Sequence, residues 1–384
     1  MNQLSRTTFL TAGALTALSA SARAAGGPLL DAVNQRPYDW GTPLGELNEG
    51  LYTSNRAFFI RSHMGPPLAI DEGAYRLRVD GLVKTPLALS LTDLKKMPRH
   101  EVPVVLQCAG NGRAFYGDAY PTASHPAGAQ WKYGGVGNAR WAGVRVRDVL
   151  AAAGVDPSAK FATNEGLDDP LLATTPKFIR GIELGKIMDD DAIFAYEMNG
   201  ESLPYYHGFP VRLIVPGWAG DHFVKWFSRM TLTDTLTTAF WTGTGYRYPN
   251  VLGEPGVGMP PDQMHPVTAI NVKSILTAPV SGSSLSAGKP IAVSGFAWSG
   301  DGATASKVEI SFDDGKSWTE ASLGASPGKY SWRQFSLPWT PQRGSATISA
   351  RATDTNGAVQ PVASPWNPSG YLWNGIQRVE VLVA

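Results

Sequence analysis

Short apolar runs dominate the pattern of hydrophobic and polar positions along this 384-residue chain, and most have the length of strands. Residues 75–81 alternate between apolar and polar side chains, which predicts a half-buried strand. Nearly continuous apolar runs, which predict buried strands, occupy residues 104–106, 192–196 and 211–215. Helical signals are few and short, at residues 90–95 with Ser90 or Thr92 as cap, at 147–154, and at 182–188. The pattern therefore predicts many short strands and few helices up to about residue 265.

From about residue 266 the sequence pattern changes: it now predicts only short strands, which are separated by turns such as Asp313-Asp314-Gly315. This rhythm is typical of an immunoglobulin-like β-sandwich, so we expect a second domain over residues 266–384. Trp298, Trp318 and Trp332 are expected to be core or interface aromatics rather than ligand contacts. The expected strands are 272–276, 291–298, 307–312, 331–335, 346–352 and 379–383.

Composition narrows the class of protein. The formal net charge is +1, from 33 basic and 32 acidic residues, which gives no reason to expect nucleic acid or an anionic membrane as a partner. Abundant Gly, Pro and Trp with only 17% charged residues favour a strand-rich and loop-rich globular protein over a helical bundle. A single cysteine rules out an internal disulfide, so stability must come from burial of the core.

Residues 1–24 have the pattern of an export signal. Arg6 precedes an apolar run at residues 9–15, and Ala22-Arg23-Ala24 fits a cleavage site of small residues. The run is too short and too rich in Ala and Thr for a membrane anchor, so no membrane span is expected. Residues 5–10 are similar to a twin-arginine signal with Thr7 in place of the second arginine. We expect cleavage near Ala24 and a mature protein in the periplasm.

The lone cysteine, Cys108, lies where a buried apolar run meets the flexible backbone of Ala109-Gly110-Asn111-Gly112. Arg113 follows directly, so a thiol at the end of a strand has a cation beside it. This setting suits a thiolate that binds a metal or attacks a substrate. The alternative is a buried, inert cysteine, which is the ordinary fate of a lone thiol.

Four cations occur in or beside apolar runs, namely Arg61, Arg113, Arg212 and Lys225. Buried cations need anions, so these side chains would form a cage for a phosphate or another oxyanion if they converge. His63 lies two residues after Arg61 and therefore faces the same side of a strand, although an exposed edge with charged tips explains this pair equally well. No glycine-rich phosphate motif opens a helix, which argues against a Walker or dinucleotide site.

Several motifs in order closely resemble the sulfite oxidase family of molybdenum enzymes. They are residues 59–63 (FIRSH), 107–111 (QCAGN), 139–143 (ARWAG), 195–200 (AYEMNG), 207–212 (HGFPVR) and 224–226 (VKW). The resemblance runs from about residue 58 to the end of the chain. It implies a molybdopterin-binding domain of mixed α+β type followed by an immunoglobulin-like dimerisation domain. It also implies oxidation of sulfite to sulfate by oxygen-atom transfer.

The resemblance assigns roles to individual residues. Cys108 corresponds to the molybdenum ligand, and thiolate is a soft, strongly donating ligand. Arg61, Arg113 and Trp131 resemble the sulfite pocket, and Tyr246 corresponds to the active-site tyrosine, with Tyr248 as a rival if the loop differs by two residues. The implied molybdopterin contacts are Phe59, Arg61, His63, Cys108, Asp168, His207, Arg212, Phe223 and Lys225.

The chain departs from the family pattern in ways that bear on its partners. No Cys-x-x-Cys-His haem motif occurs, so no haem is expected in this chain and electrons would go to an external c-type cytochrome. We expect a homodimer or a dimer with a haem subunit. Asp301-Gly302-Ala303 stand where the animal pattern brings an arginine to the anion pocket, and Gly112 replaces a basic residue.

Three other functions remain open at this point. Two lie within the family: a sulfane dehydrogenase subunit of a thiosulfate-oxidising complex, and a reductase of another oxyanion or oxide. From a different class, a secreted immunoglobulin-like binding module with an inert cysteine would show neither molybdenum nor pterin on analysis.

Overall fold

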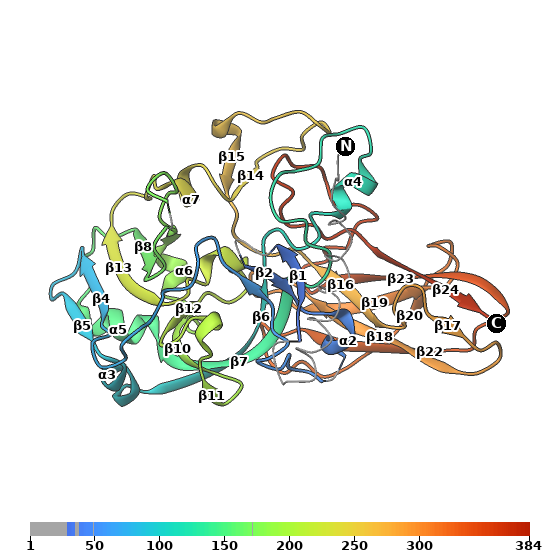
Figure 1. The fold of residues 1–384 in the computed structure, drawn as a ribbon, viewed down its shortest axis with the longest axis horizontal. Helices are drawn as coiled ribbons and strands as arrows, with labels where there is room; N and C mark the ends of the chain where they lie inside the picture. Colours follow the sequence, from blue (N-terminus) through green and yellow to red (C-terminus); the bar gives the residue numbers. More distant parts are fainter. Residues whose placement is uncertain (1–28, 35–37, 49, 171) are drawn as a thin grey trace, which may run out of the picture.

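The computed structural model describes residues 29–34, 38–48, 50–170 and 172–384. Residues 1–24, where the export signal is expected, lie outside the described part of the chain. Figure 1 shows one lobe of strands and short helices beside a second lobe built of strands, which ends at the C-terminus. Few helices occur and the longest described one has 8 residues, so the chain is richer in sheet than the α+β expectation suggested.

Two five-stranded sheets form the framework of the first lobe. One has the order β11-β10-β7-β6 with β12 paired to β10, and the other has the order β5-β4-β13-β8-β9. Their shared core is the largest apolar cluster, and it includes Leu77, Val104, Trp141, Phe194 and Phe227. The strands are β4 (Leu77–Gly81), β5 (Leu87–Leu89), β6 (Arg99–Gln107), β7 (Val136–Arg145), β8 (Phe161–Gly166), β9 (Ile179–Glu183), β10 (Ile193–Met198), β11 (Glu201–Ser202), β12 (Arg212–Ile214) and β13 (Phe227–Thr233).

Smaller elements complete this lobe. The helices are α2 (Leu44–Leu47), α3 (Leu91–Lys96), α4 (Phe115–Ala119), α5 (Val146–Ala153), α6 (Leu184–Ile187) and α7 (Phe240–Gly243). The 3-10 turns are η1 (Tyr205–His207), η2 (Gly220–His222) and η3 (Pro261–Gln263). The remaining strands are β1 (Asp31–Asn34), β2 (Asp39–Gly41) and β3 (Ile60–Arg61), which form one sheet, and the pair β14 (Arg247–Pro249) and β15 (Met264–Pro266).

Local signals placed two of the three expected helices well. Ser90, rather than Thr92, caps α3, because its hydroxyl accepts from the backbone N–H of Asp93 at 3.1 Å. Helix α5 ends at Gly154, whose φ of 69° is the left-handed C-terminal conformation. The helix expected at 182–188 is shorter, because Ile182 pairs with β8 as part of β9.

The second lobe is a β-sandwich of two sheets, with the orders β16-β18-β22-β21 and β17-β24-β23-β19-β20. Alternate residues of both sheets, such as Val293, Val308, Ile348 and Val381, meet in one apolar core. The strands are β16 (Lys273–Ala278), β17 (Ser284–Leu285), β18 (Ile291–Trp298), β19 (Ala305–Ser311), β20 (Thr319–Glu320), β21 (Ser322–Leu323), β22 (Arg333–Trp339), β23 (Gly344–Asp354) and β24 (Gln377–Val383).

The two lobes share a buried junction. Trp298 and Trp332 lie in an apolar cluster with Val105 and Ala109 of the first lobe, as expected for core or interface aromatics. Trp298 Nε1 donates to Gln107 Oε1 at 3.0 Å. Trp318 instead is half-buried on a hairpin, where its indole donates to the carbonyl of its own turn. The end of β6, directly before Cys108, is therefore packed against the second lobe.

The fully buried Lys273 of β16 also crosses this junction. Its Nζ donates to the carbonyl oxygens of Asn111 at 3.2 Å and Trp373 at 2.8 Å. The ammonium thus ties the loop after Cys108 to the second lobe. Over the described residues, no helix is both long and apolar enough to cross a membrane.

Candidate functional site

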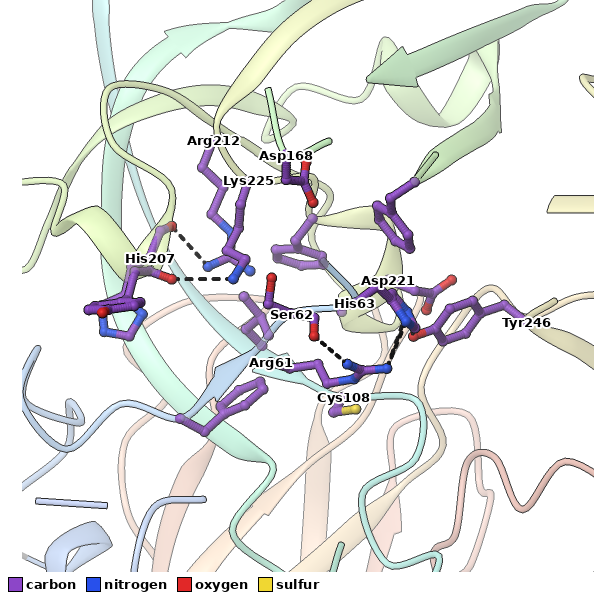
Figure 2. A pocket seen from close by; sticks show the side chains of 16 residues that line it. Arg61, Ser62, His63, Cys108, Asp168, His207, Arg212, Asp221, Lys225 and Tyr246 are labelled. Carbon is purple, nitrogen blue, oxygen red and sulfur yellow. Dashed lines mark hydrogen bonds between the residues drawn. The ribbon is translucent and has the colours of Figure 1, made fainter. Parts of the chain in front are cut away.

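Two cavities meet at Cys108, and both also contact Arg61, His63 and Tyr246. Figure 2 shows the first cavity, with Arg212, Lys225 and Asp168 gathered at one end and Cys108 beside Arg61 at the other. The first cavity is lined by every residue expected to contact molybdopterin: Phe59, Arg61, His63, Cys108, Asp168, His207, Arg212, Phe223 and Lys225. The second cavity is lined by Arg113 and Trp131, the other two residues of the expected anion pocket.

Cys108 is fixed where β6 runs into a tight turn. Its backbone N–H donates to the carbonyl of Gly135 at 2.8 Å, and its carbonyl accepts from the N–H of Asn111 at 2.9 Å. Gly112 has a φ of 98°, and a Cβ on it would lie 2.5 Å from Trp373, so the basic residue of the family pattern would not fit at this position. Burial raises the pKa of the Cys108 thiol, whereas the neighbouring Arg61 cation lowers it.

A polar chain leads from Asp39 through Arg61 and His63 to Tyr246. Arg61 Nη1 lies 3.1 Å from Asp39 Oδ1, and Arg61 Nη2 donates to His63 Nδ1 at 2.8 Å. Because an arginine can only donate, Nδ1 accepts and His63 Nε2 carries the hydrogen. His63 Nε2 therefore donates to the Tyr246 hydroxyl oxygen at 2.5 Å. Burial, with the Arg61 cation second, holds the pKa of His63 well below 6.5, so the ring is neutral.

This arrangement leaves the hydroxyl hydrogen of Tyr246 free to be donated elsewhere. Burial raises the pKa of Tyr246 well above 10.0, so the phenol keeps its proton at neutral pH. Tyr248, the alternative considered from the sequence, lines neither cavity and packs near His265 instead. The geometry therefore favours Tyr246 as the tyrosine of the site.

Arg212 and Lys225 form the cationic end of the first cavity. Arg212 Nη1 donates to the carbonyl of His207 at 3.2 Å, and its Nε has no partner among the described residues. Burial lowers the pKa of Arg212 to about 9, and it also lowers that of Lys225 while raising that of Asp168. The buried Arg212 with its unsatisfied donor and the half-buried Lys225 in the same cavity form a site for an anionic group such as a phosphate.

Arg113 and Trp131 belong to the second cavity. Arg113 Nη1 donates to the carbonyl of Ala129 at 3.0 Å, and its guanidinium lies 5.0 Å from the ring centre of Tyr371. Trp131 is buried, and its Nε1 has no partner among the described residues. The positive charge of Arg113 and the unpaired N–H of Trp131 suit a small anion. Asp301 and Ala303 line a separate recess and contribute to neither cavity.

No cluster of three His, Cys, Asp or Glu side chains that could hold a metal occurs among the described residues. A metal at Cys108 therefore needs further ligands from a bound group. The first cavity fits such a group, because it starts at the thiol and ends at the unsatisfied cations. The residues present thus fit an anionic organic cofactor that carries the metal.

Several residues of the site were missed from the sequence. Asp39 pairs with Arg61, and the rings of Phe178 and Trp241 lie 4.9 and 4.0 Å from His63 between ring centres. Asp221 lines the first cavity and forms a fully buried ion pair with Arg180. Single carboxylates and aromatics far apart in the chain carry no local signal of such contacts. Only Asp221, close before Phe223 and Lys225, was near a residue already singled out.

Residues 63–241 match the family model described as the oxidoreductase molybdopterin binding domain, and residues 264–384 match the Mo-co oxidoreductase dimerisation domain. The mitochondrial sulfite oxidase of Mus musculus is 37% identical over 372 residues, covering 93% of this chain and 66% of the mouse protein. The sulfite oxidase of Gallus gallus is 35% identical over 362 residues, covering 90% of this chain and 76% of the chicken protein.

The chain belongs to the sulfite oxidase family. A molybdopterin-binding oxidoreductase domain is thus followed by a dimerisation domain, in the order that the resemblance implied. The chain spans 66% of the length of its mammalian relatives in the sulfite oxidase family. A solved structure titled as the sulfane dehydrogenase SoxCD from Paracoccus pantotrophus matches with a TM-score of 0.76 and 29% identity, covering 93% of this chain and 88% of that chain.

Proposed function

We propose that this chain oxidises sulfite to sulfate by oxygen-atom transfer and passes the electrons to an external c-type cytochrome. The observation that carries the proposal is the meeting of two different cavities at one thiol. The first cavity has buried cations far from Cys108, as a phosphate-bearing cofactor requires, and the second has Arg113 and Trp131 close to it, as a small anion requires.

The cofactor, molybdenum-molybdopterin, supplies the metal centre that exchanges an oxygen atom and accepts two electrons. Cys108 would hold the metal as thiolate, since metal binding removes the thiol proton despite its raised pKa. Arg212 and Lys225 would hold the phosphate, and Asp168, which lines the same cavity, would accept from N–H groups of the heterocycle. The remaining contacts are His207, Phe59 and Phe223, which shape the wall of the cavity.

Sulfite binds in the second cavity, where Arg61 and Arg113 neutralise its charge and stabilise charge that develops on oxygen. Trp131 Nε1 is a further donor without a competing partner among the described residues. Because His63 donates to the Tyr246 oxygen, the Tyr246 hydroxyl is oriented to donate its own hydrogen to the substrate. The rings of Phe178 and Trp241 pack against His63, and each lines one of the two cavities.

A second candidate is a sulfane dehydrogenase subunit, which the likeness to the SoxCD structure supports. A reductase of another oxyanion or oxide uses the same donors and remains a third substrate class. The test is reduction of a c-type cytochrome by molybdenum-loaded protein, with sulfite, thiosulfate and carrier-bound sulfane sulfur compared at equal concentration. Turnover with sulfite alone supports the proposal, whereas turnover only with sulfane sulfur favours the second candidate.

Location and assembly complete the proposal. The composition of residues 1–24 supports export to the periplasm with cleavage near Ala24. The match to a dimerisation domain supports a homodimer or a dimer with a haem subunit through residues 266–384, which we assign to the immunoglobulin-like sandwiches. Light scattering of the purified chain tests the dimer, and a monomer at micromolar concentration contradicts the homodimer.

A further inference from the structure

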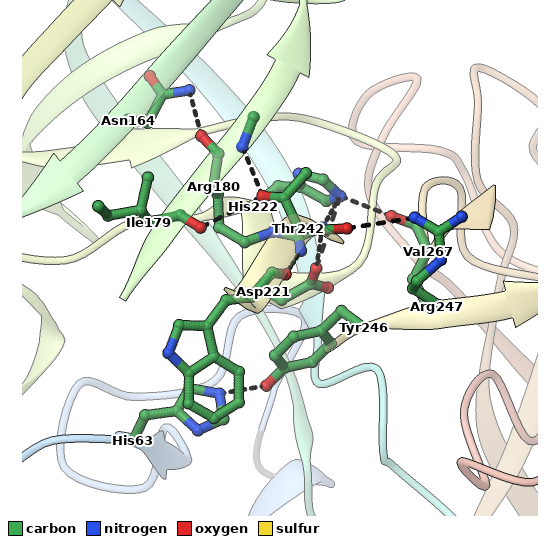
Figure 3. Close-up of polar contacts among 12 residues, drawn as sticks. His63, Asn164, Ile179, Arg180, Asp221, His222, Thr242, Tyr246, Arg247 and Val267 are labelled. Carbon is green, nitrogen blue, oxygen red and sulfur yellow. Dashed lines mark hydrogen bonds and ion pairs between the residues drawn. The ribbon is translucent and has the colours of Figure 1, made fainter. Parts of the chain in front are cut away.

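A fully buried ion pair lies behind Tyr246, and its arginine lines neither cavity. Arg180 of β9 and Asp221 of η2 have side chains with no exposed area, and Arg180 Nη2 lies 2.8 Å from Asp221 Oδ2. Figure 3 shows the pair on one side of Tyr246, whose hydroxyl turns toward His63. Neither residue was singled out by any motif of the sequence.

The pair is connected to the segment that carries Tyr246. Arg180 Nη1 donates to the carbonyl of Trp241, and the Arg180 guanidinium lies 5.3 Å from the ring centre of Tyr246. Thr242 Oγ1 accepts from the backbone N–H of Gly181 at 2.9 Å, so β9 holds α7 at a second point. One buried guanidinium therefore contacts both the ring of Tyr246 and the helix that precedes it.

Tyr246 needs such support because its backbone is strained. Its φ of 51° lies in the left-handed region, which non-glycine residues occupy at a cost of about 1–2 kcal/mol. The ring stacks on Tyr371 with 5.1 Å between ring centres, and Arg180 approaches the same ring. Without contacts of this kind, the strained segment would relax and move the hydroxyl away from His63 Nε2.

A buried ion pair is weak as a source of stability, because the desolvation of both charges offsets their attraction. Asp221 shows this cost directly, since burial raises its pKa to about 6 although Arg180 lowers it. Replacement of both partners by apolar residues is often neutral for stability. The directional contacts of Arg180 with Trp241 and Tyr246 thus point to a role in geometry rather than in stability.

We propose that Arg180, held by Asp221, is a positioning residue that fixes the ring of Tyr246 with its hydroxyl at the substrate cavity. The proposal rests on the proposed function for its kinetic consequence, but not for its structural one. Asp221 cancels the charge of Arg180, so the pair orients the tyrosine without adding a competing cation to the anion pocket.

The kinetic test is a cycle of variants: Tyr246→Phe, Arg180→Met/Asp221→Leu, and all three together. Replacing both charges avoids leaving one buried and unpaired. We expect the double variant to lower kcat with sulfite by roughly ten- to a hundredfold, because small misplacement of a catalytic group has effects of this size. In the Tyr246→Phe background the same two changes should have little further effect. Equal losses in both backgrounds would overturn the proposal, and so would an unchanged kcat.

A second readout does not depend on activity. In protein labelled with ¹³Cζ-tyrosine, the Tyr246 signal is assigned by its loss in Tyr246→Phe. We expect one sharp signal in the parent and a shifted or broadened one in Arg180→Met/Asp221→Leu, whereas an unchanged signal overturns the positioning role. If the parent has no sulfite activity, the proposed function fails and this signal alone decides the positioning role.

A surface ion pair, Arg229 and Asp80, 2.8 Å apart, provides the control. The variant Arg229→Gln/Asp80→Asn should change neither readout.

Discussion

The Cys108 thiol is a soft donor in a site that is rich in cations and aromatic rings. Cys108→Ser should abolish activity and molybdenum binding, because an alkoxide is a harder and poorer donor to the metal than thiolate. The fold should persist, since the backbone hydrogen bonds of residue 108 do not involve sulfur. Metal analysis and thermal unfolding of the purified variant check both parts. Sulfite turnover near the parental rate would show that Cys108 is not the ligand.

Substitution of Arg61 also affects Asp39, which pairs with it, so the test of Arg61 must measure stability as well as kinetics. Arg61→Gln should raise KM for sulfite roughly ten- to a hundredfold, since loss of a charge-assisted contact costs about 1.5–3 kcal/mol. It also leaves Asp39 buried without its cation, so stability should fall as well.

The double variant Arg61→Gln/Asp39→Asn separates the two effects of Arg61. It should recover stability while keeping the raised KM, with molybdenum content measured alongside. An unchanged KM at full metal occupancy in either variant would place Arg61 outside the sulfite pocket.

Single residues could be predicted where their chemistry was unusual for their surroundings. One such case is the lone thiol of Cys108 beside glycines, and another is the set of cations that lie within apolar runs. The first cavity brings Cys108 together with three of these cations, Arg61, Arg212 and Lys225. Their partners could not be predicted, because a carboxylate such as Asp39 looks like any surface residue until the fold buries it.

At the scale of elements, the turn after β6 depends on one glycine. Gly112→Ala should destabilise the fold by roughly 2–4 kcal/mol, from the left-handed φ of 98° and from overlap with Trp373. Urea unfolding measures the change. Gly258 is the matched control, since a Cβ there meets nothing within 4 Å and its φ is not left-handed. Equal effects of the two alanines would mean that the turn adapts freely.

Elements were recognisable in sequence because alternation, apolar runs and caps are local signals. Their pairing was not, because it depends on contacts between distant segments. The parallel pairing of β13 with β4 and the addition of Ile182 to β9 are both of this kind. For this reason Arg180 was missed as a neighbour of Tyr246: it lies on β9, and nothing in the sequence indicated that β9 passes close to Tyr246.

At the scale of the whole molecule, the order of the two parts could be predicted from the change in strand rhythm near residue 266. The junction could not, because tryptophans such as Trp298 fit either a core or an interface. Through this junction the second lobe supports the cysteine loop, so its role is not limited to dimerisation. Lys273 makes the dependence most direct, since its ammonium contacts the carbonyl of Asn111.

Lys273 makes the stability of the molecule depend on pH. Burial lowers its pKa from 10.5 to about 7, so between these values the unfolded chain binds one more proton than the folded chain. The free energy of unfolding should therefore rise with pH over this window, by about 1.4 kcal/mol per unit from this group. Below pH 7 the penalty is fully present, and above 10.5 it is absent.

Lys273→Met should flatten this slope, whereas the exposed Lys289→Met should not. Urea unfolding at several pH values between 7 and 10 measures the slopes. Parallel stability curves for the parent and Lys273→Met would mean that Lys273 keeps its proton on folding.

Because the pKa of Lys273 falls on folding, closure of the junction should release a proton, and the time course of this release can be measured. A chain that refolds near pH 8.5 must release a proton from Lys273 as the second lobe closes over the cysteine loop. In weakly buffered solution, an indicator dye would report that release. A smaller release in Lys273→Met would identify the share of Lys273, since burial lowers the pKa of Lys225 as well. Assembly of the framework around Cys108 would then be visible without metal, cofactor or substrate.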